Sequence, residues 1–289
     1  MRTKLSTLFA SAALALGVAP AWAIDVAPGD YRINPAGTNI LLLYLQNQSS
    51  DKFVLNDNEV PDSELEVNAA ILRGLHYTEA FGMPAMYQAV LPIVGFSSAE
   101  IGGADRDTSE GIGDLTLGFT LWPVQPDNPE TGTTLGFTMH VTAPTGNYDV
   151  NDISAGSGAW TLTPQVGLNQ GLGKGYFFDA YFDAAFSFDH DENGMTVERD
   201  PAYQLQAYIR KQFSPKTSIS AGFSMQRGGD IEIGGVDTGL RTERDQFRLY
   251  ANTFVTPTVQ VQGMLAKDFN VDGGFENDHT FELRFVKLF

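Results

Sequence analysis

The sequence predicts an all-β fold, a transmembrane antiparallel β-barrel of about 12 strands with short periplasmic turns and long acidic outer loops. Three observations predict it. Long segments alternate between apolar and polar side chains, which is the period of a strand and not of a helix. The polar positions of several segments carry charges that a dry core would not tolerate. Tight links between the segments alternate with long acidic links along the chain.

The first 23 residues have the three parts of a secretory signal peptide. Two basic side chains precede the apolar run 8–18, and Ala21-Trp22-Ala23 forms a small-x-small cleavage site. The run is shorter than the roughly 20 residues that a spanning helix needs. We therefore expect residues 1–23 to be a signal peptide that is removed on export.

Residues 24–38 precede the first expected strand. They contain two prolines and two glycines and show no alternation. Two interpretations stay open: the segment folds into the lumen as a small plug, or it lies loose in the periplasm, which is the commoner fate of a chain terminus. The transmembrane barrel is assigned to residues 39–289.

The expected strands differ in how regularly they alternate. In the clearest segment, Leu115, Leu117 and Phe119 share one face, while small polar residues occupy the other. The regular segments are 115–121, 134–142, 176–188, 203–210, 218–226, 247–252, 259–265 and 281–285. Less regular candidates at 39–48, 65–78, 85–97 and 159–171 bring the total to about 12, an even number like that of bacterial barrels.

The links support the same topology. Tight links are expected at 171–175, 214–216 and 256–257, and the long acidic ones are 47–64, 97–110, 144–158, 189–200, 228–243 and 270–278. Residues 122–129 depart from the rule, because this periplasmic link is long and contains three prolines. Proline cannot donate to a ladder, so we expect an extended turn there.

A soluble β-sandwich or a water-soluble barrel would also alternate. Several segments are longer than the usual soluble strand of about 5–6 residues, and aromatic residues gather near strand ends as they do at membrane interfaces. The sequence therefore favours the outer membrane of a Gram-negative bacterium. Phe289 resembles the terminal aromatic signal that the outer-membrane assembly machinery recognises, although Lys287 breaks the alternation.

The composition narrows the expected partners. The net charge is −17, so the surface should repel nucleic acid. The chain has no cysteine, which excludes disulfides and thiol-based sites. We expect outer-membrane lipid, the assembly machinery and a small-molecule solute as partners, and no cofactor.

Charged and polar residues on the inward faces are the candidate pore-lining residues. A lumen that carries both signs of charge orders water and selects polar solutes. The alternative is that these side chains pair across neighbouring strands and brace the barrel. The candidates are Asp179, Tyr181, Asp183, Gln204, Arg210, Arg248, Asn252, Glu282 and Arg284.

One acidic loop invites a calcium hypothesis. Asp189, Asp191 and Asn193 match the opening of a calcium loop, with Asp200 at the position of its last ligand. Asp200 is shorter than the usual bidentate glutamate, and no helix is expected on either side. A solvated hairpin tip is therefore favoured over a metal site.

An enzyme is the least favoured class. The four histidines fall in separate segments, and no serine lies in a nucleophile-elbow pattern. His140 is expected on the inward face, where a lone histidine is more often a packing residue. We therefore expect no catalytic residues.

Four groups of residues carry a family resemblance. They are Pro28-Gly29-Asp30-Tyr31 with 35–39, the segment 111–118, the segment 143–149 and the segment 158–165. In this order they resemble the family of outer-membrane transporters named after the meta-pathway of phenol degradation. The resemblance implies a porin-like channel for passive uptake of small molecules, including hydrophobic or aromatic compounds. The alternatives are a structural or adhesin-like barrel with a closed lumen and an outer-membrane lipid-modifying enzyme.

Overall fold

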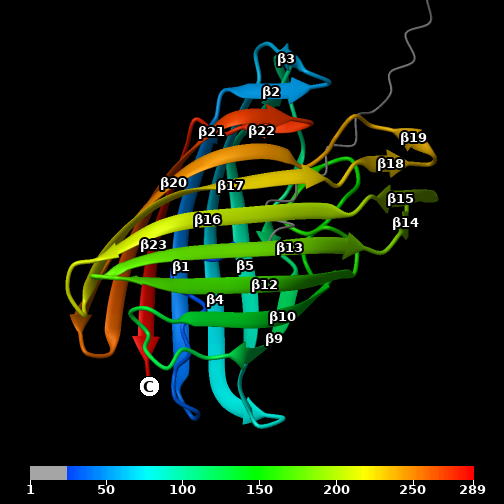
Figure 1. Ribbon diagram of the computed structural model, residues 1–289. Helices are drawn as coiled ribbons and strands as arrows, with labels where there is room; N and C mark the ends of the chain where they lie inside the picture. The colour runs from blue at the N-terminus through cyan, green and yellow to red at the C-terminus, as the bar shows by residue number, and fades with distance from the viewer. Residues whose placement is uncertain (1–24) are drawn as a thin grey trace, which may run out of the picture.

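The long segments that alternate between apolar and polar residues form β-strands, and together these strands close into a barrel (Figure 1). The computed structural model describes residues 25–289, so the predicted signal peptide and Ile24 lie outside the described residues. The twelve barrel strands are β1 (Asn39–Ser50), β4 (Glu64–Ala80), β5 (Met83–Ile101), β9 (Leu115–Val124), β10 (Thr133–Ala143), β12 (Thr161–Gly173), β13 (Tyr176–Ser187), β16 (Ala202–Gln212), β17 (Thr217–Gly228), β20 (Glu243–Thr256), β21 (Val259–Asp272) and β23 (His279–Leu288).

Each barrel strand pairs antiparallel with the next, and β1 closes the ring by pairing with β23 as well as β4. Ile40 is the register partner of Leu288 in this closing pair. The prediction of an antiparallel barrel of about 12 strands is confirmed. None of residues 25–289 lies in a helix that is long and apolar enough to cross a membrane.

The two faces of the wall differ as the alternation predicts. Ile209 on β16 is 49% exposed, whereas its neighbour Arg210 is 4% exposed and points inward. Large apolar side chains such as Phe223 and Leu249 are exposed on the outside, where hydrocarbon covers them in a membrane. The inner face buries polar side chains, including Gln206 and Asp183.

Tight turns and long loops occupy opposite ends of the barrel. Lys174 and Gly175 connect β12 to β13, and both have positive φ angles of 55° and 73°, as a two-residue type I′ hairpin requires. The C-terminus lies at this periplasmic end, at the bottom of Figure 1.

The outer loops contain short strands and pack over the other end of the barrel. One small sheet consists of β2 (Lys52–Leu55), β3 (Asn58–Val60) and β22 (Gly274–Glu276). A second consists of β14 (His190–Glu192), β15 (Met195–Arg199), β18 (Ile231–Ile233) and β19 (Val236–Asp237). The remaining short strands are β6 (Ala104–Asp105), β7 (Thr108–Ser109), β8 (Gly111–Ile112) and β11 (Ile153–Ser154).

Apolar side chains from these loops form a cluster that we call the outer cluster. It joins loop residues to inward-facing residues of β4 and β5. Its buried members are Phe53, Leu65, Val67, Val94, Ile101, Val150, Ile153, Ala155, Val197, Ile231, Leu240 and Phe275. The long acidic loops thus have an apolar underside, which holds them over the barrel mouth by burial.

The extended turn expected at 122–129 starts later than predicted, because residues 122–124 belong to β9, although Pro123 itself has no register partner on β10. Strand β9 continues through Pro123 to Val124, which is the register partner of Leu135. The register shifts between Leu135 and Phe137, and a bulge of this kind leaves a backbone position unpaired, where a residue without an N–H group is tolerated. The link itself is therefore 125–132.

Candidate functional site

Residues 25–31 lie inside the barrel, where their backbone bonds to side chains of the wall, and residues 35–37 are exposed just before β1. The Val26 N–H donates to Gln206 at 3.3 Å, and the Gly29 N–H donates to the Tyr181 hydroxyl at 3.1 Å. The Tyr31 hydroxyl donates to Gln165 at 3.0 Å. We call residues 25–38 the lumen segment.

Two carboxylates of the lumen segment pair with arginines of three strands. Asp25 lies 3.0 Å from Arg248 of β20. Asp30 lies 2.9 Å from Arg284 of β23 and 3.7 Å from Arg73 of β4. Each arginine is buried, and a buried charge is tolerated when an opposite charge accompanies it. These pairs fix the lumen segment to one side of the wall, where β4, β1, β23, β21 and β20 are neighbours in this order.

Aromatic rings surround the lumen segment in the periplasmic half of the barrel. The Tyr31 ring lies 5.4 Å from the Tyr181 ring and 6.3 Å from the Trp122 ring, between centroids. Trp122 also donates from Nε1 to the Tyr31 carbonyl oxygen at 3.0 Å and stacks on Tyr77. The lumen segment therefore packs as a core element rather than as a loose end.

Asp179 and Arg210 form a buried ion pair beside Gly29 of the lumen segment. Arg210 donates from Nε and Nη2 to the two Asp179 oxygens at 2.8 and 3.1 Å, and Asn169 donates to Asp179 at 2.6 Å. Asp179 is fully buried. This geometry matches the bracing alternative for these two residues.

The other predicted pore-lining residues also point inward, and each has polar partners. Tyr181 contacts the lumen segment, Asp183 accepts from Gln165, and Gln204 donates to Asp25. Asn252 donates to Ser218, and Glu282 accepts from Gln46. Among the predicted residues, Arg248 and Glu282 line the cavity described next.

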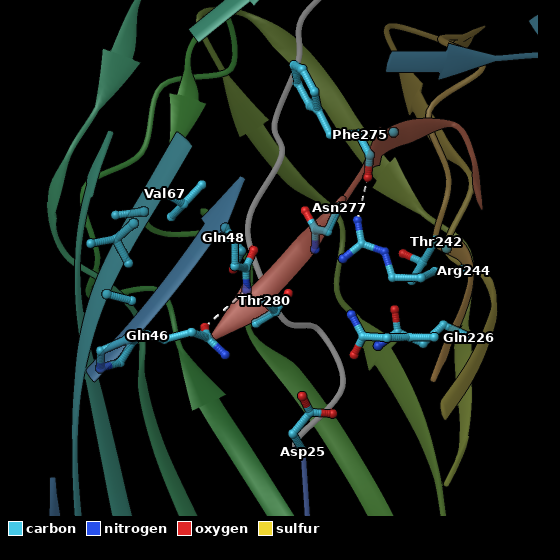
Figure 2. A pocket seen from close by; sticks show the side chains of 18 of the residues that line it. Asp25, Gln46, Gln48, Val67, Gln226, Thr242, Arg244, Phe275, Asn277 and Thr280 are labelled. Carbon is cyan, nitrogen blue, oxygen red and sulfur yellow. Dashed lines mark hydrogen bonds between the residues drawn. The ribbon is translucent and has the colours of Figure 1, made fainter. Parts of the chain in front are cut away.

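A cavity of about 320 Å³ lies in the lumen between the outer cluster and the lumen segment. Figure 2 shows Asp25 below it and Phe275 above it. Its wall on β4 and β5 is apolar toward the outer cluster, where Leu65, Val67 and Val94 face inward, and Arg73 lines it further along β4. On β1 and β23 the wall is polar, with Gln46, Gln48 and Thr280. The cavity is thus amphipathic across its width.

Asp114 holds the loops at one side of the cavity. Its carboxylate accepts hydrogen bonds from the Gly146 N–H at 2.8 Å, from the Ser157 N–H at 2.8 Å and from the Ser157 hydroxyl at 2.5 Å. Asp114 and Gly146 belong to the segments 111–118 and 143–149, which carry the family resemblance. Two motifs far apart in the sequence therefore meet at the cavity wall.

The structure does not gather the proposed calcium ligands. Asn193 and Gly194 form a two-residue turn between β14 and β15, and Asp191 instead accepts a hydrogen bond from Thr196 at 2.9 Å. Asp200 bonds through its backbone to Asp230. Within residues 25–289, no group of three or more histidine, cysteine or acidic side chains is arranged to hold a metal ion.

Two loop residues outside the membrane-spanning strands contact each other above the cavity. The rings of Tyr148 and His190 lie 5.4 Å apart. Burial lowers the pKa of His190 and raises the pKa of Tyr148 to about 12. Both side chains are therefore neutral at neutral pH, as an apolar contact between loops requires.

His140 is buried on β10, as its inward position predicts. Its register partners are Gly118 of β9 and Thr163 of β12, and neither is a serine.

Residues outside the predicted pore-lining set hold the site together. Arg73, Asp25 and Asp30 are the main examples, since they complete the ion pairs of the lumen segment. Arg73 could have been predicted from the alternation along β4, which places it on the same inward face as Leu65 and Val67. Asp30 belongs to the motif 28–31 that carries the family resemblance, whereas Asp25 lies in a segment without periodicity, where only its charge offered a signal.

A family model described as "Putative MetA-pathway of phenol degradation" matches residues 46–285. The chain belongs to this family. The crystal structure of the COG4313 outer membrane channel from Pseudomonas putida F1 is similar to this family member over 92% of this chain and 100% of that one. The sequence identity is 31%, and the TM-score is 0.83. No curated protein matches the chain in sequence.

Two further solved structures are more distant from this MetA-pathway family member. The NanC porin has 10% identity and a TM-score of 0.48, covering 85% of this chain and 98% of that chain. The CymD monoaromatic hydrocarbon channel has 9% identity and a TM-score of 0.48, covering 89% of each chain. The family match and the similarity to the Pseudomonas structure place this barrel in the outer membrane.

Proposed function

We propose that the chain is a channel for the passive uptake of small molecules, with apolar and aromatic compounds among its solutes. The observation that supports this most directly is the amphipathic cavity inside the lumen. Its apolar wall on β4 and β5 would offer an apolar solute a surface that a water-filled pore lacks. The family description, which refers to phenol degradation, supports the same class of solute.

In this proposal the lumen segment is a plug. It fills the periplasmic half of the lumen with aromatic contacts and with the ion pairs of Asp25 and Asp30. A solute in the cavity reaches the periplasm when the segment shifts and these pairs separate. The concentration gradient supplies the direction of transport, and the stability of the ion pairs sets how often the plug opens.

The outer surface of the barrel supports two further proposed partners, outer-membrane lipid and the assembly machinery. The exposed apolar side chains of the outer wall would contact outer-membrane lipid, as for Ile209 and Phe223. Phe289 is 70% exposed beside the closing strand pair, where the assembly machinery could contact its ring.

Single-channel recording in planar bilayers tests the proposal. The variant Asp30→Asn removes the charge that Arg284 and Arg73 share, so it should give openings that are longer or more frequent than those of the wild type. Asp51→Asn, an exposed loop change, is the control and should behave as the wild type. If wild type and Asp30→Asn both fold and neither conducts, the closed structural or adhesin-like barrel replaces the channel.

A further inference from the structure

Four lysines lie at the periplasmic end of the barrel, and we call them the basic rim. Lys174 is in the turn between β12 and β13, and Lys216 is in the turn between β16 and β17. Lys211 is near the end of β16, and Lys287 is near the end of β23. The strands β12, β13, β16, β17, β20, β21 and β23 are neighbours in this order, so the four lysines occupy one continuous side of the rim, at the lower left of Figure 1.

The two ends of the barrel differ in how their lysines are paired. At the outer end, Lys52 lies 3.8 Å from Glu276, and Lys267 lies 3.8 Å from Asp278. The basic rim forms no ion pair with any carboxylate of residues 25–289. The segments around it contain no aspartate or glutamate; they are 171–176, 211–218, 253–259 and 285–289. This side of the rim therefore carries positive charge that the protein itself does not neutralise.

Lys211 brings two neighbouring hairpins of the basic rim together. Its Nζ donates to the Lys174 carbonyl oxygen at 2.6 Å and lies 4.0 Å from the centre of the Tyr176 ring. Tyr176 is the register partner of Lys211, and its ring is exposed on the outer face. An aromatic ring with a polar tip beside a cation is typical of the boundary between a membrane and water.

The basic rim borders the apolar outer wall of the barrel. Lys211 points outward together with Ile219, its exposed register partner on β17. Lys287 lies on the outward face of β23, two residues after the exposed Phe285, and its Nζ donates to the Thr258 hydroxyl at 2.8 Å. A lysine at the edge of an apolar wall can lay its stem against acyl chains while its ammonium group reaches the headgroups. This position also accounts for Lys287, which breaks the apolar alternation of the last strand.

The other side of the periplasmic rim has the opposite charge. Glu79, Asp127 and Glu130 are exposed there, and the segments 78–84 and 125–132 contain no lysine or arginine. The chain as a whole has a net charge of −17, which repels anionic surfaces. The basic rim is therefore the part of the periplasmic end where an anionic lipid gains a favourable contact.

We propose that the basic rim binds the headgroup of an anionic phospholipid in the periplasmic leaflet of the outer membrane. The lipid phosphate accepts from the ammonium groups of Lys174 and Lys211, which bind phosphate as compact charges. The acyl chains lie along the apolar outer face of β16 and β17, where Ile209 and Ile219 are exposed. This inference goes beyond the proposed function, because it concerns the lipid-facing surface and holds for any solute that the lumen carries.

Native mass spectrometry of the refolded barrel in mild detergent tests the proposal. The probes are phosphatidylglycerol and phosphatidylcholine with identical acyl chains, so only the headgroup differs. The wild type should bind phosphatidylglycerol more tightly than phosphatidylcholine. The double variant Lys174→Gln with Lys211→Gln should reduce the ratio of the two dissociation constants by about fivefold for each lysine, because each removes one attraction to the anionic lipid.

Two further double variants separate a specific site from a general effect of charge. Lys52→Gln with Lys267→Gln removes the same charge at the outer end and should keep the wild-type preference. Lys174→Arg with Lys211→Arg retains both charges and should keep the preference as well. Lys287 is left unchanged, because its Nζ lies 5.5 Å from the centre of the Phe289 ring. Heat-modifiable migration in gels confirms that each variant is a folded barrel.

Three outcomes would overturn the lipid site. The wild type could bind the two lipids equally well, or the variants at the two ends could lose the preference to the same extent. The third outcome is that glycerol 3-phosphate, a headgroup without acyl chains, binds as tightly as phosphatidylglycerol, which would make the basic rim a site for soluble phosphate compounds.

The lipid site and the proposed channel fail separately. In planar bilayers of phosphatidylcholine, Lys174→Gln with Lys211→Gln should conduct as the wild type does, since neither lysine lines the cavity. A barrel that prefers phosphatidylglycerol and does not conduct would contradict the channel alone. A barrel that conducts without any lipid preference would contradict the basic rim as a lipid site and leave the channel proposal standing.

Discussion

Tyr31 of the lumen segment packs directly against Gly167 of β12. A Cβ atom added at Gly167 would lie 2.3 Å from the Tyr31 ring, which is closer than any side chain tolerates. The Tyr31 hydroxyl also lies 2.7 Å from the Thr138 hydroxyl. The wall therefore has a recess that fits this one ring, and the position of the lumen segment depends on a residue without a side chain.

Gly167→Ala should displace Tyr31 and loosen the lumen segment. We expect the free energy of unfolding to fall by about 1–3 kcal/mol, as overpacking of a filled space does, and channel openings to become more frequent. Urea unfolding of the refolded barrel and planar bilayer recording measure the two effects. Gly263→Ala is the control, because nothing lies within 4 Å of its added Cβ. Equal behaviour of the two variants would contradict the fit of Tyr31 into the wall.

Breaking the Asp179–Arg210 pair should destabilise the barrel. Arg210→Met leaves a buried carboxylate without its cation, so we expect a loss of about 3–5 kcal/mol in the free energy of unfolding. The double variant Asp179→Leu with Arg210→Met removes both charges and should recover most of that loss. Denaturant titration measures both. A double variant as unstable as the single one would show that the pair itself stabilises the wall.

The contact between His190 and Tyr148 should depend on pH. Burial lowers the pKa of His190 in the folded state, so the unfolded loop binds a proton more readily than the folded loop. The contribution to loop stability is present above the ordinary histidine pKa of about 6.5 and is lost as the pH falls below it.

Amide hydrogen exchange in β14 and β15 checks this pH dependence. Exchange, corrected for its intrinsic pH dependence, should be faster at pH 5 than at pH 7.5, while the barrel strands stay protected. His190→Gln stays neutral throughout and should remove the difference between the two pH values. Loss of protection in the variant at low pH would assign the effect to the neighbouring acidic groups, such as Glu192, instead.

Phe289 should matter for assembly more than for the stability of the finished barrel. Its backbone N–H donates to the Asn39 carbonyl at 2.9 Å, whereas its side chain is exposed. Phe289→Ala keeps the backbone bond, so we expect a folded barrel that accumulates several-fold more slowly in the outer membrane. Pulse-chase labelling with heat-modifiable gels measures this rate. Phe213→Ala, at another exposed aromatic residue, is the control.

The sequence was sufficient for the barrel because alternation depends on local spacing. Arg210 points inward and Ile209 outward for no reason beyond their order along the chain. The partners of the inward charges were beyond reach, because Asp30 and Arg284 are 254 positions apart and no periodic signal relates them. The bounds of the turn after β9 were misplaced for a different reason, since a bulge in β9 itself accommodates Pro123 without a register partner.

The ion pairs of Asp30 also constrain the order in which parts of the barrel can assemble. One of its two cations, Arg73, belongs to the second strand of the ring, and the other, Arg284, belongs to the last. Residues 25–38 are synthesised before every barrel strand, yet their electrostatic contacts become complete only after the final strand has docked beside β1. This early part of the chain is thus the last to gain all of its contacts, and the complete set of ion pairs at Asp30 requires a closed barrel.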